Sequence, residues 1–234
     1  MTTLELNEET PPPWQQSGSL PAAVANDLKG ILRTDGEEPW GLFVQQEAFG
    51  GWAERCGTVI ERKSITGTRY RGGVEHEIVE DGERERVIKI THPGQYGHLG
   101  SCQWGKLELV QAKPLEYLAR LDLVNQLFRD DNRILGAIRH SSGARIVSAQ
   151  PMIRGDHAEK GEVIEWMRSL GFAAAGQKTY WNANEGLAIF DAHPGNVLRI
   201  PDGRLCPIDI IPCIADARMA SFLNQRVKAW AAKH

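Results

Sequence analysis

Residues 189–198 read IFDAHPGNVL. This stretch places an acid, Asp191, an imidazole, His193, and an amide, Asn196, in a Pro-Gly turn between two apolar segments. Polar side chains on a loop that strands hold in place are the usual geometry of a functional site. Thirteen residues after the amide, Asp209 stands between two isoleucines. A carboxylate in an apolar strand needs a partner or a metal ion, because an unpaired buried charge is costly.

The residue types in this stretch suit metal and acid-base chemistry. Asn and Asp oxygens bind hard cations such as Mg²⁺, which proteins usually hold through one or two side chains together with substrate phosphates. Asn196 and Asp209 are therefore candidate metal ligands, and Asp191 is a candidate base. His193 either orients Asp191 or caps the turn. A purely structural polar turn, or a metal-dependent hydrolase that uses Asp191, His193 and Asp209, is also compatible with these residues.

The spacing of these residues is similar to that of a known superfamily. An Asp, an Asn five residues later and a second Asp thirteen residues further on resemble the catalytic loop and the metal-binding Asp of the protein-kinase-like superfamily. The loop at 191–196 is similar to that of aminoglycoside phosphotransferases. Over about residues 59–212 the chain resembles the small serine/threonine/tyrosine kinase domains of phage and mobile-element polyvalent proteins. The matching segments include VIKITHPGQYG at 87–97 and the helical pattern at 114–128.

The resemblance implies an α+β protein-kinase-like fold that is compact and two-lobed, with a minimal carboxy-terminal lobe. We expect a flexible amino-terminal arm at 1–20 and an amino-terminal lobe of antiparallel sheet and crossing helix at 21–150. The carboxy-terminal lobe, at 151–234, would contain the catalytic loop and the metal-binding Asp. The resemblance also implies ATP and Mg²⁺ as cofactors, and a protein or small-molecule hydroxyl as the acceptor.

The resemblance assigns a lysine and an acidic partner for it. Lys89, in the sequence VIKI, matches the lysine that contacts nucleotide phosphates and also assists catalysis. Its alternative is an ordinary strand lysine that faces solvent. Glu116, on the following helix, is the expected partner of Lys89, although an acid in a first helical turn also suits the helix dipole. Asp122 is the second choice.

The nucleotide would contact two further segments. Gly72 and Gly73 stand where a glycine-rich phosphate loop belongs, although the full G-x-G-x-x-G pattern is absent. Residues 66–68 are a rival position for that loop. Gln150 and Met152 lie where the adenine-binding hinge falls, and backbone groups there would bind the base.

Some residues depart from the kinase pattern. Asp209 is followed by two isoleucines instead of Phe and Gly, and Ile189 stands where the superfamily has a histidine. These departures leave a nucleotide-binding pseudokinase, acting as an interaction module, as an alternative. Only 25 residues follow Asp209, so we expect no peptide-binding helical subdomain. The acceptor is then small or unusual, or the enzyme depends on a protein partner.

Hydrophobic periodicity predicts the secondary structure around these motifs. Apolar residues three and four positions apart predict helices at 21–33, 114–128 and 159–170, and a closing helix is expected at 216–233. Alternation and turn residues predict the strands. They are expected at 58–65, 68–71, 76–80, 86–91, 133–139, 144–150, 179–181, 187–190, 196–200 and 205–210.

Composition sets the broad class. The 234 residues are 41% hydrophobic, which allows a sizeable core. The net charge of −3 excludes a whole-chain basic field for nucleic acid or anionic lipid. No segment approaches 18 uninterrupted apolar residues, so no membrane span is expected. The spacing of the four cysteines fits neither a zinc site nor a redox pair, and we expect reduced thiols in a cytosolic protein. The resemblance to polyvalent proteins implies the cytoplasm of a bacterium or of a phage-infected host.

Overall fold

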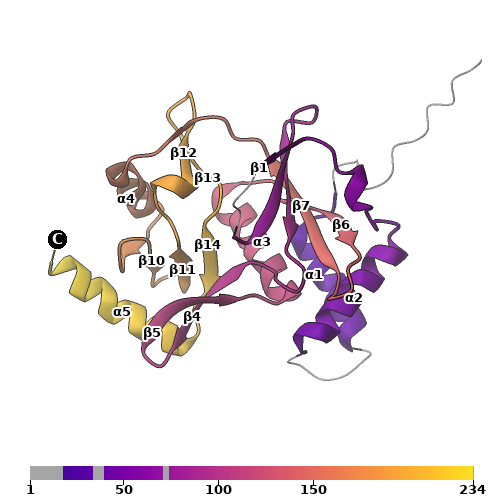
Figure 1. Cartoon of the computed structure of the whole chain (residues 1–234). Coiled ribbons are helices and arrows are strands. Elements are labelled where there is room, and N and C mark those ends of the chain that lie inside the picture. The colour runs from indigo at the N-terminus through magenta and orange to yellow at the C-terminus, as the bar shows by residue number, and fades with distance from the viewer. Residues whose placement is uncertain (1–17, 34–39, 71–73, 234) are drawn as a thin grey trace, which may run out of the picture.

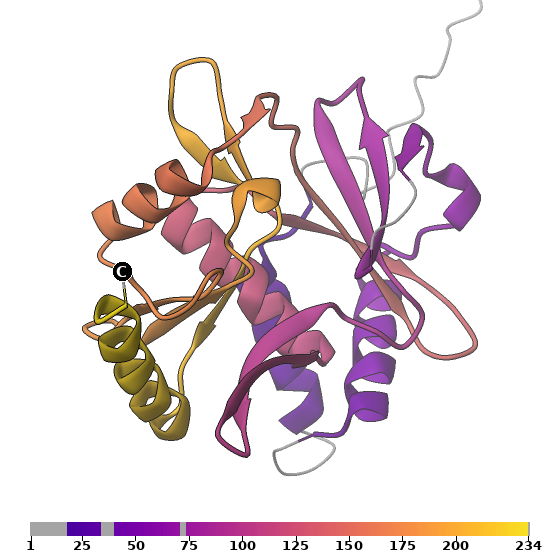
Figure 2. The ribbon, with the colours of Figure 1, turned by 60° about the vertical axis from the view of Figure 1, so that its left-hand side comes forward.

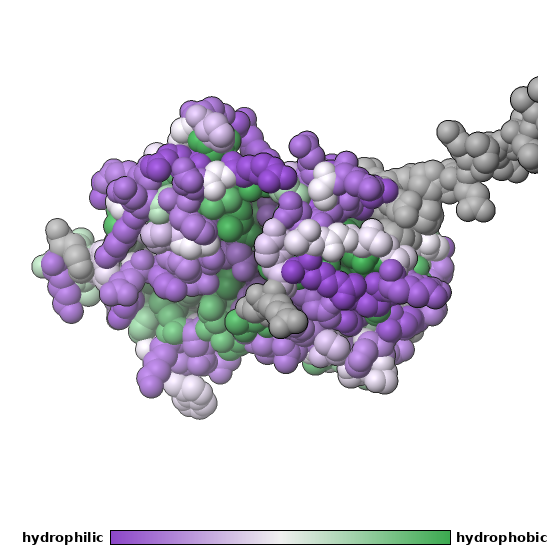
Figure 3. All heavy atoms as spheres, turned by 45° about the horizontal axis from the view of Figure 1, so that its top comes forward, coloured by the Kyte–Doolittle hydropathy of each residue, from purple (hydrophilic) through white to green (hydrophobic). Residues whose placement is uncertain are grey.

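The computed structural model describes residues 18–33, 40–70 and 74–233. Nearly all of the expected arm at 1–20, together with Gly72 and Gly73, lies outside the described residues. Helices and antiparallel sheets are both present, which confirms the α+β class. Within the described ranges, none of the helices has the length and apolar character needed to cross a membrane. The face shown in Figure 3 is mostly hydrophilic, with apolar atoms gathered near its middle.

A five-stranded antiparallel sheet, here called the main sheet, dominates one half of the molecule (Figure 1). Its strands follow the order β1-β2-β3-β7-β6. They are β1 (Thr68–Tyr70), β2 (His76–Asp81), β3 (Arg86–Thr91), β7 (Arg145–Pro151) and β6 (Arg133–Ile138). Residues in β3 alternate between the two faces of the sheet, as the period of two requires. The central position of β3 puts Lys89 in the middle of the sheet.

Both faces of the main sheet are covered. On one face lie the helices α1 (Pro21–Arg33), α2 (Leu42–Arg55) and α3 (Pro114–Phe128). On the other face, Ile60 and Ile65 pack against apolar strand residues such as Ile88. Helix α3 runs through the middle of the molecule, between the main sheet and the carboxy-terminal elements (Figure 2).

The carboxy-terminal elements form two small sheets flanked by two helices. One sheet has the order β14-β11-β10-β9 and the other the order β13-β12-β8. Helix α4 (Lys160–Ser169) packs on the apolar residues of both, and helix α5 (Ala217–Ala231) packs on the first. The strands are β8 (Asp156–His157), β9 (Ala173–Ala174), β10 (Tyr180–Asn182), β11 (Leu187–Phe190), β12 (Val197–Arg199), β13 (Leu205–Pro207) and β14 (Ile211–Ile214).

A hairpin between β3 and α3 joins the two halves of the molecule. Its strands, β4 (His98–Gln103) and β5 (Lys106–Gln111), form a separate two-stranded sheet that lies beside α5 (Figure 1). Cys102 is buried among carboxy-terminal residues such as Trp181. Gly100 lies against the ring of Phe190, and a Cβ at position 100 would overlap that ring. The packing of the hairpin therefore crosses the lobe boundary expected at residue 150.

The strongest periodic patterns are confirmed. Helices α1 and α3 and strands β3 and β11 have the predicted bounds. The strand predicted at 58–65 is wrong, because a 3₁₀ turn at Arg62–Ser64 interrupts it. Helix α2 and the hairpin had no predicted counterpart. The helix contains Gly50 and Gly51, which weaken helix propensity, but Gly50 leaves room for the Arg139 guanidinium against it.

Replacing Gly100 with Val should destabilise the fold. The added side chain would force Phe190 out of its packed position, and overpacking of this kind costs about 1 to 3 kcal/mol. Denaturant unfolding monitored by tryptophan fluorescence measures the change. Gln103→Val, on the exposed face of the same strand, is the matched control and should change stability by no more than about 0.5 kcal/mol. Equal stability of Gly100→Val and the wild type would contradict the close packing of the hairpin.

Candidate functional site

A cavity of about 280 Å³ lies between the main sheet and the β12–β13 hairpin. One end is polar, with Lys89, Asn196 and Asp209 in its wall. The remainder is mostly apolar, and side chains from β2 and β3 face side chains from the β12–β13 segment across it. The other lining residues are Ile78, Val87, Gln150, Ile153, Leu198 and Ile208. A largely apolar pocket with a few convergent polar groups is the usual form of a ligand site.

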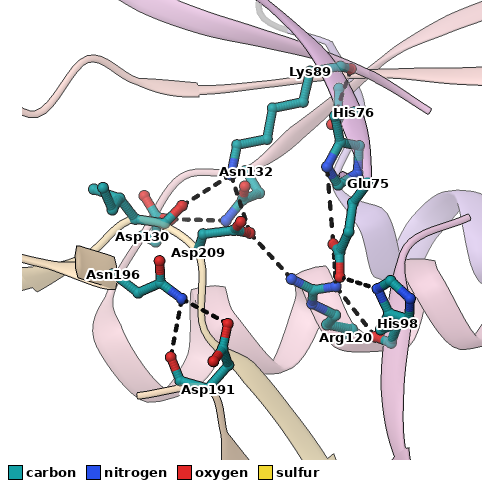
Figure 4. Close-up of polar contacts among 12 residues, drawn as sticks. Glu75, His76, Lys89, His98, Arg120, Asp130, Asn132, Asp191, Asn196 and Asp209 are labelled. Carbon is teal, nitrogen blue, oxygen red and sulfur yellow. Dashed lines mark hydrogen bonds and ion pairs between the residues drawn. The ribbon is translucent and has the colours of Figure 1, made fainter. Parts of the chain in front are cut away.

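Lys89 points into this cavity and not into bulk solvent. Its side chain is only 12% exposed. The ammonium donates to the carbonyl oxygen of Ile208 at 2.8 Å and lies 3.7 Å from Asp209 Oδ1 (Figure 4). Val87 and Lys89 share the face of β3 that lines the cavity, whereas Ile88 and Ile90 pack into the core behind it. The structure therefore excludes the alternative of a solvent-facing strand lysine.

Asp209 lies between two cations. Besides Lys89, the Arg120 guanidinium donates to Asp209 Oδ1 through Nη2 at 3.2 Å. Burial raises the pKa of Asp209, but the charges of Lys89 and Arg120 outweigh it and hold the pKa below its ordinary value. Asp209 is therefore an ionised carboxylate, and both cations contact the same oxygen atom.

The catalytic-loop candidates Asp191 and Asn196 are hydrogen-bonded to each other. The Asn196 amide nitrogen donates to the Asp191 carboxylate at 3.0 Å and to the Asp191 carbonyl oxygen at 2.9 Å. Asp191 has a φ of 55°, a left-handed conformation that few residues other than glycine adopt. Asp and Asn tolerate it better than other side chains do. Strained backbone of this kind tends to occur at functional sites.

Two further side chains contact the Asp191 carboxylate. His193 Nδ1 accepts from the Gly195 backbone, and His193 Nε2 lies 3.4 Å from Asp191 Oδ1. His193 thus caps the turn and also faces Asp191, and its role in orienting Asp191 stays a prediction. The Lys178 ammonium donates to Asp191 Oδ1 at 3.2 Å. Lys178 reaches the loop from the segment before β10, and nothing in its sequence position signals this.

The residues at the polar end of the cavity fit a magnesium ion. The Asn196 amide nitrogen is turned toward Asp191, so its oxygen points away from Asp191 (Figure 4). The shortest contacts of Lys89 and Arg120 with Asp209 both go to Oδ1, at 3.7 and 3.2 Å, and Oδ2 is the oxygen that a metal ion would contact. One carboxylate and one amide oxygen, completed by phosphates and water, form a ligand set that Mg²⁺ accepts. No group of three or more His, Cys, Asp or Glu side chains with metal-binding geometry occurs among the described residues.

The predicted Lys89–Glu116 pair is wrong. Glu116 is exposed, and its carboxylate accepts from the Lys113 backbone N–H at 2.7 Å as part of a capping box. An acid at the third position of a helix commonly caps the helix in this way. Asp122, the second choice, accepts from Gln126 one turn further along α3. Among the described residues, the carboxylate that forms an ion pair with Lys89 is that of Asp209.

The nucleotide-binding residues expected at the hinge separate into two groups. Gln150 is buried and lines the cavity. The Met152 backbone N–H donates to the Glu85 carbonyl oxygen, so that donor is not available to bind a base. Ile153, next to it, lines the cavity instead. The phosphate-loop role of Gly72 and Gly73 stays a prediction. The rival loop at 66–68 leads into β1, and Gly67, just before that strand, packs closely on the Glu80 backbone.

Sequence reasoning missed the polar cluster behind Lys89. Arg120 donates through Nη1 to Glu75 Oε2 at 2.7 Å, and His98 Nδ1 lies 2.7 Å from Glu75 Oε1. A signal for Arg120 was present, because it lies one helical turn from the apolar residues Tyr117 and Val124 of α3. Glu75 and His98 lie in loop and hairpin segments without a comparable signal.

A buried histidine completes this cluster. His76 packs on the ring of Tyr117, with centroids 5.5 Å apart. Burial, followed by the charge of Lys89, lowers the pKa of His76 to about 3. The imidazole is therefore neutral and adds no positive charge beside Lys89.

A small space of about 20 Å³ adjoins the cavity and shares Lys89 and Asp209 with it. Its lining is part apolar and part polar, with Arg120 from α3 and with Asp130 and Asn132 from the segment between α3 and β6. The volume and these polar groups suit one water molecule. Asp130 accepts from the side chain of Asn132 at 2.8 Å, which fixes this part of the lining (Figure 4).

The comparisons with known proteins identify the family of the chain. No curated protein and no solved structure matches it. A family model described as serine/threonine/tyrosine kinase found in polyvalent proteins matches residues 44–216, well over half of the chain. The matched range contains the cavity, Lys89, the loop at 191–196 and Asp209. The chain therefore belongs to the family of serine/threonine/tyrosine kinases found in polyvalent proteins.

Proposed function

We propose that the protein is an ATP- and Mg²⁺-dependent phosphotransferase with a two-lobed kinase-like fold, which phosphorylates a hydroxyl group. The observation that carries the proposal is the convergence of Lys89, Asn196 and Asp209 on one cavity. These residues come from β3, the turn after β11 and the segment after β13. An ammonium, an amide oxygen and a carboxylate are the groups that a nucleotide phosphate and its metal ion require.

The shape of the cavity supports a nucleotide as the ligand. Ile78 and Val87 of the main sheet line one side, and Leu198 and Ile208 line the other. A flat adenine ring would fit between these two apolar walls. Its phosphates would then extend toward the polar end, where the Lys89 ammonium neutralises part of their charge.

The proposed reaction uses the chain's own residues in distinct roles. Asn196 and Asp209 hold the metal ion, which when bound neutralises charge on the phosphate oxygens. Asp191 orients the acceptor hydroxyl and receives its proton. The acceptor oxygen forms a bond to the γ-phosphorus while the bond from that phosphorus to the ADP oxygen breaks. The Lys178 ammonium, 3.2 Å from Asp191 Oδ1, would place a positive charge beside the phosphoryl group as it is transferred.

The loop geometry supports an active enzyme over the pseudokinase alternative. Ile189 replaces the expected histidine, but it is fully buried in the core of the carboxy-terminal elements. Asp191 is nevertheless fixed by Asn196, His193 and Lys178. Fixed geometry matters because phosphoryl transfer depends mainly on positioning and charge stabilisation.

Thermal unfolding with ATP and Mg²⁺ tests nucleotide binding. A ligand that binds only the folded state at one hundred times its Kd adds about 2.7 kcal/mol of stability. For a chain of this length that should raise Tm by roughly 5 to 10 °C. Asp209→Asn should abolish most of the shift, because it removes the carboxylate charge. Tight retention of a transition metal without any ATP-dependent shift would instead support the hydrolase alternative.

Transfer of labelled γ-phosphate tests catalysis. Asp191→Asn should lower the rate by about 10²- to 10⁴-fold, because the amide cannot accept the hydroxyl proton. Asn is chosen because it tolerates the left-handed backbone at position 191. The assay uses γ-labelled ATP with a cell lysate as a source of acceptors. Nucleotide binding by the wild type without any labelled product would favour the pseudokinase.

Lys178→Met should reduce transfer while leaving nucleotide binding intact. Loss of a group that stabilises transition-state charge costs about 10²- to 10³-fold in kcat. The matched control is Lys106→Met, an exposed lysine on β5. If both variants keep the wild-type rate, Lys178 has no part in the reaction.

A further inference from the structure

Helix α3 directs a cation, and not an acid, at the metal-binding carboxylate. The Arg120 side chain is 5% exposed and comes from the middle of α3. Its Nη2 donates to Asp209 at 3.2 Å, and its Nη1 donates to Glu75 at 2.7 Å and to the His98 carbonyl oxygen at 3.1 Å. A guanidinium is suited to this arrangement because its donors diverge in a fixed plane.

The two cations give the two oxygens of the Asp209 carboxylate different surroundings. Lys89 and Arg120 both approach Oδ1, so the orientation of the carboxylate is fixed about that atom. Oδ2 is left for a ligand in the cavity. Because the Asp209 side chain is 45% exposed, without these contacts it would be free to rotate.

Glu75 allows Arg120 to remain charged where it is buried. Burial lowers the pKa of Arg120, but Glu75 and then Asp209 outweigh this and raise it. Glu75 is itself held by His98. The beginnings of β2 and β4 are thereby tied to α3 and, through Arg120, to Asp209.

We propose that Arg120 is a positioning residue that holds Asp209 Oδ1 so that Oδ2 faces the metal ion of the bound nucleotide. Glu75 acts as the counter-charge that keeps Arg120 in place. This inference rests on the proposed function, because it requires a nucleotide-bound metal ion at Asp209. The competing explanation is structural: Arg120 only anchors α3 to Glu75.

The two explanations predict opposite changes in Mg²⁺ affinity. If Arg120 only anchors α3, its removal takes away one positive charge near the metal ion and should strengthen Mg²⁺ binding. If Arg120 positions Asp209, its removal should weaken Mg²⁺ binding. Loss of a residue that orients a metal ligand typically costs 10- to 100-fold in metal affinity.

The experiment measures binding of a fluorescent non-hydrolysable ATP analogue as a function of Mg²⁺ concentration, together with Tm without ligand. Arg120→Gln leaves Glu75 buried without its partner and should lower Tm. The double variant Glu75→Gln/Arg120→Gln should recover much of that Tm, because no buried charge is left unpaired. Half-maximal binding in the double variant should still require roughly tenfold more Mg²⁺ than in the wild type.

Two further variants separate positioning from anchoring. Glu75→Gln removes the counter-charge that keeps Arg120 in place, so its Mg²⁺ requirement should lie between those of the wild type and the double variant. Glu77→Gln/Arg145→Gln removes another ion pair on the main sheet, with an N–O distance of 2.6 Å, which does not touch Asp209. It should change Tm without changing the Mg²⁺ requirement.

The outcomes distinguish this inference from the function on which it rests. If the wild type binds the analogue but the double variant needs the same Mg²⁺ or less, Arg120 is not a positioning residue and the phosphotransferase proposal stands. If the wild type shows no Mg²⁺-dependent binding, both are overturned. A raised Mg²⁺ requirement in the double variant, with none in Glu77→Gln/Arg145→Gln, supports the role of Arg120.

Discussion

A balanced set of four charges organises the centre of this molecule. Lys89 and Arg120 are the cations, and Glu75 and Asp209 are the anions. Each belongs to a different segment, so the set joins the central strand, the crossing helix, the start of β2 and the segment after β13. Within the set, Arg120 and Glu75 are the buried pair, and removing one member of a buried ion pair typically costs about 3 to 5 kcal/mol, because its partner keeps an uncompensated charge. The contact between α3 and the segment before β2 therefore depends on both residues.

The parts of the fold that followed from the sequence are those with strong local patterns. Residues 114–128 have a proline at the start and apolar residues at helical spacing, and α3 has those bounds. The strand at 86–91 and the loop at 191–196 are also where the pattern places them. In each case the residues that decide the structure are neighbours in sequence, so the pattern contains most of the information.

The remaining features depend on contacts between residues far apart in the chain. The sequence pattern favoured Glu116 as the partner of Lys89, because it is an acid near the start of the next helix. In the folded chain Glu116 caps α3, and Arg120 is the α3 residue that points toward Asp209. Lys178 reaches Asp191 only because the β10–β11 pairing brings them together. Helix α2 contains two glycines, and its position against Arg139 becomes visible only in the folded chain.

The β4–β5 hairpin also affects the order in which the chain can fold during synthesis. Its buried face, which includes Cys102, is covered by Trp181 and by Leu223 of α5. These partners are translated about 80 and 120 residues after the hairpin, a delay of roughly 4 to 24 s at usual rates. During that time the main sheet can assemble while the hairpin keeps an apolar face exposed. The contact that joins the two halves is thus completed late, and until then the nascent chain has an exposed surface on which chaperones or aggregation can act.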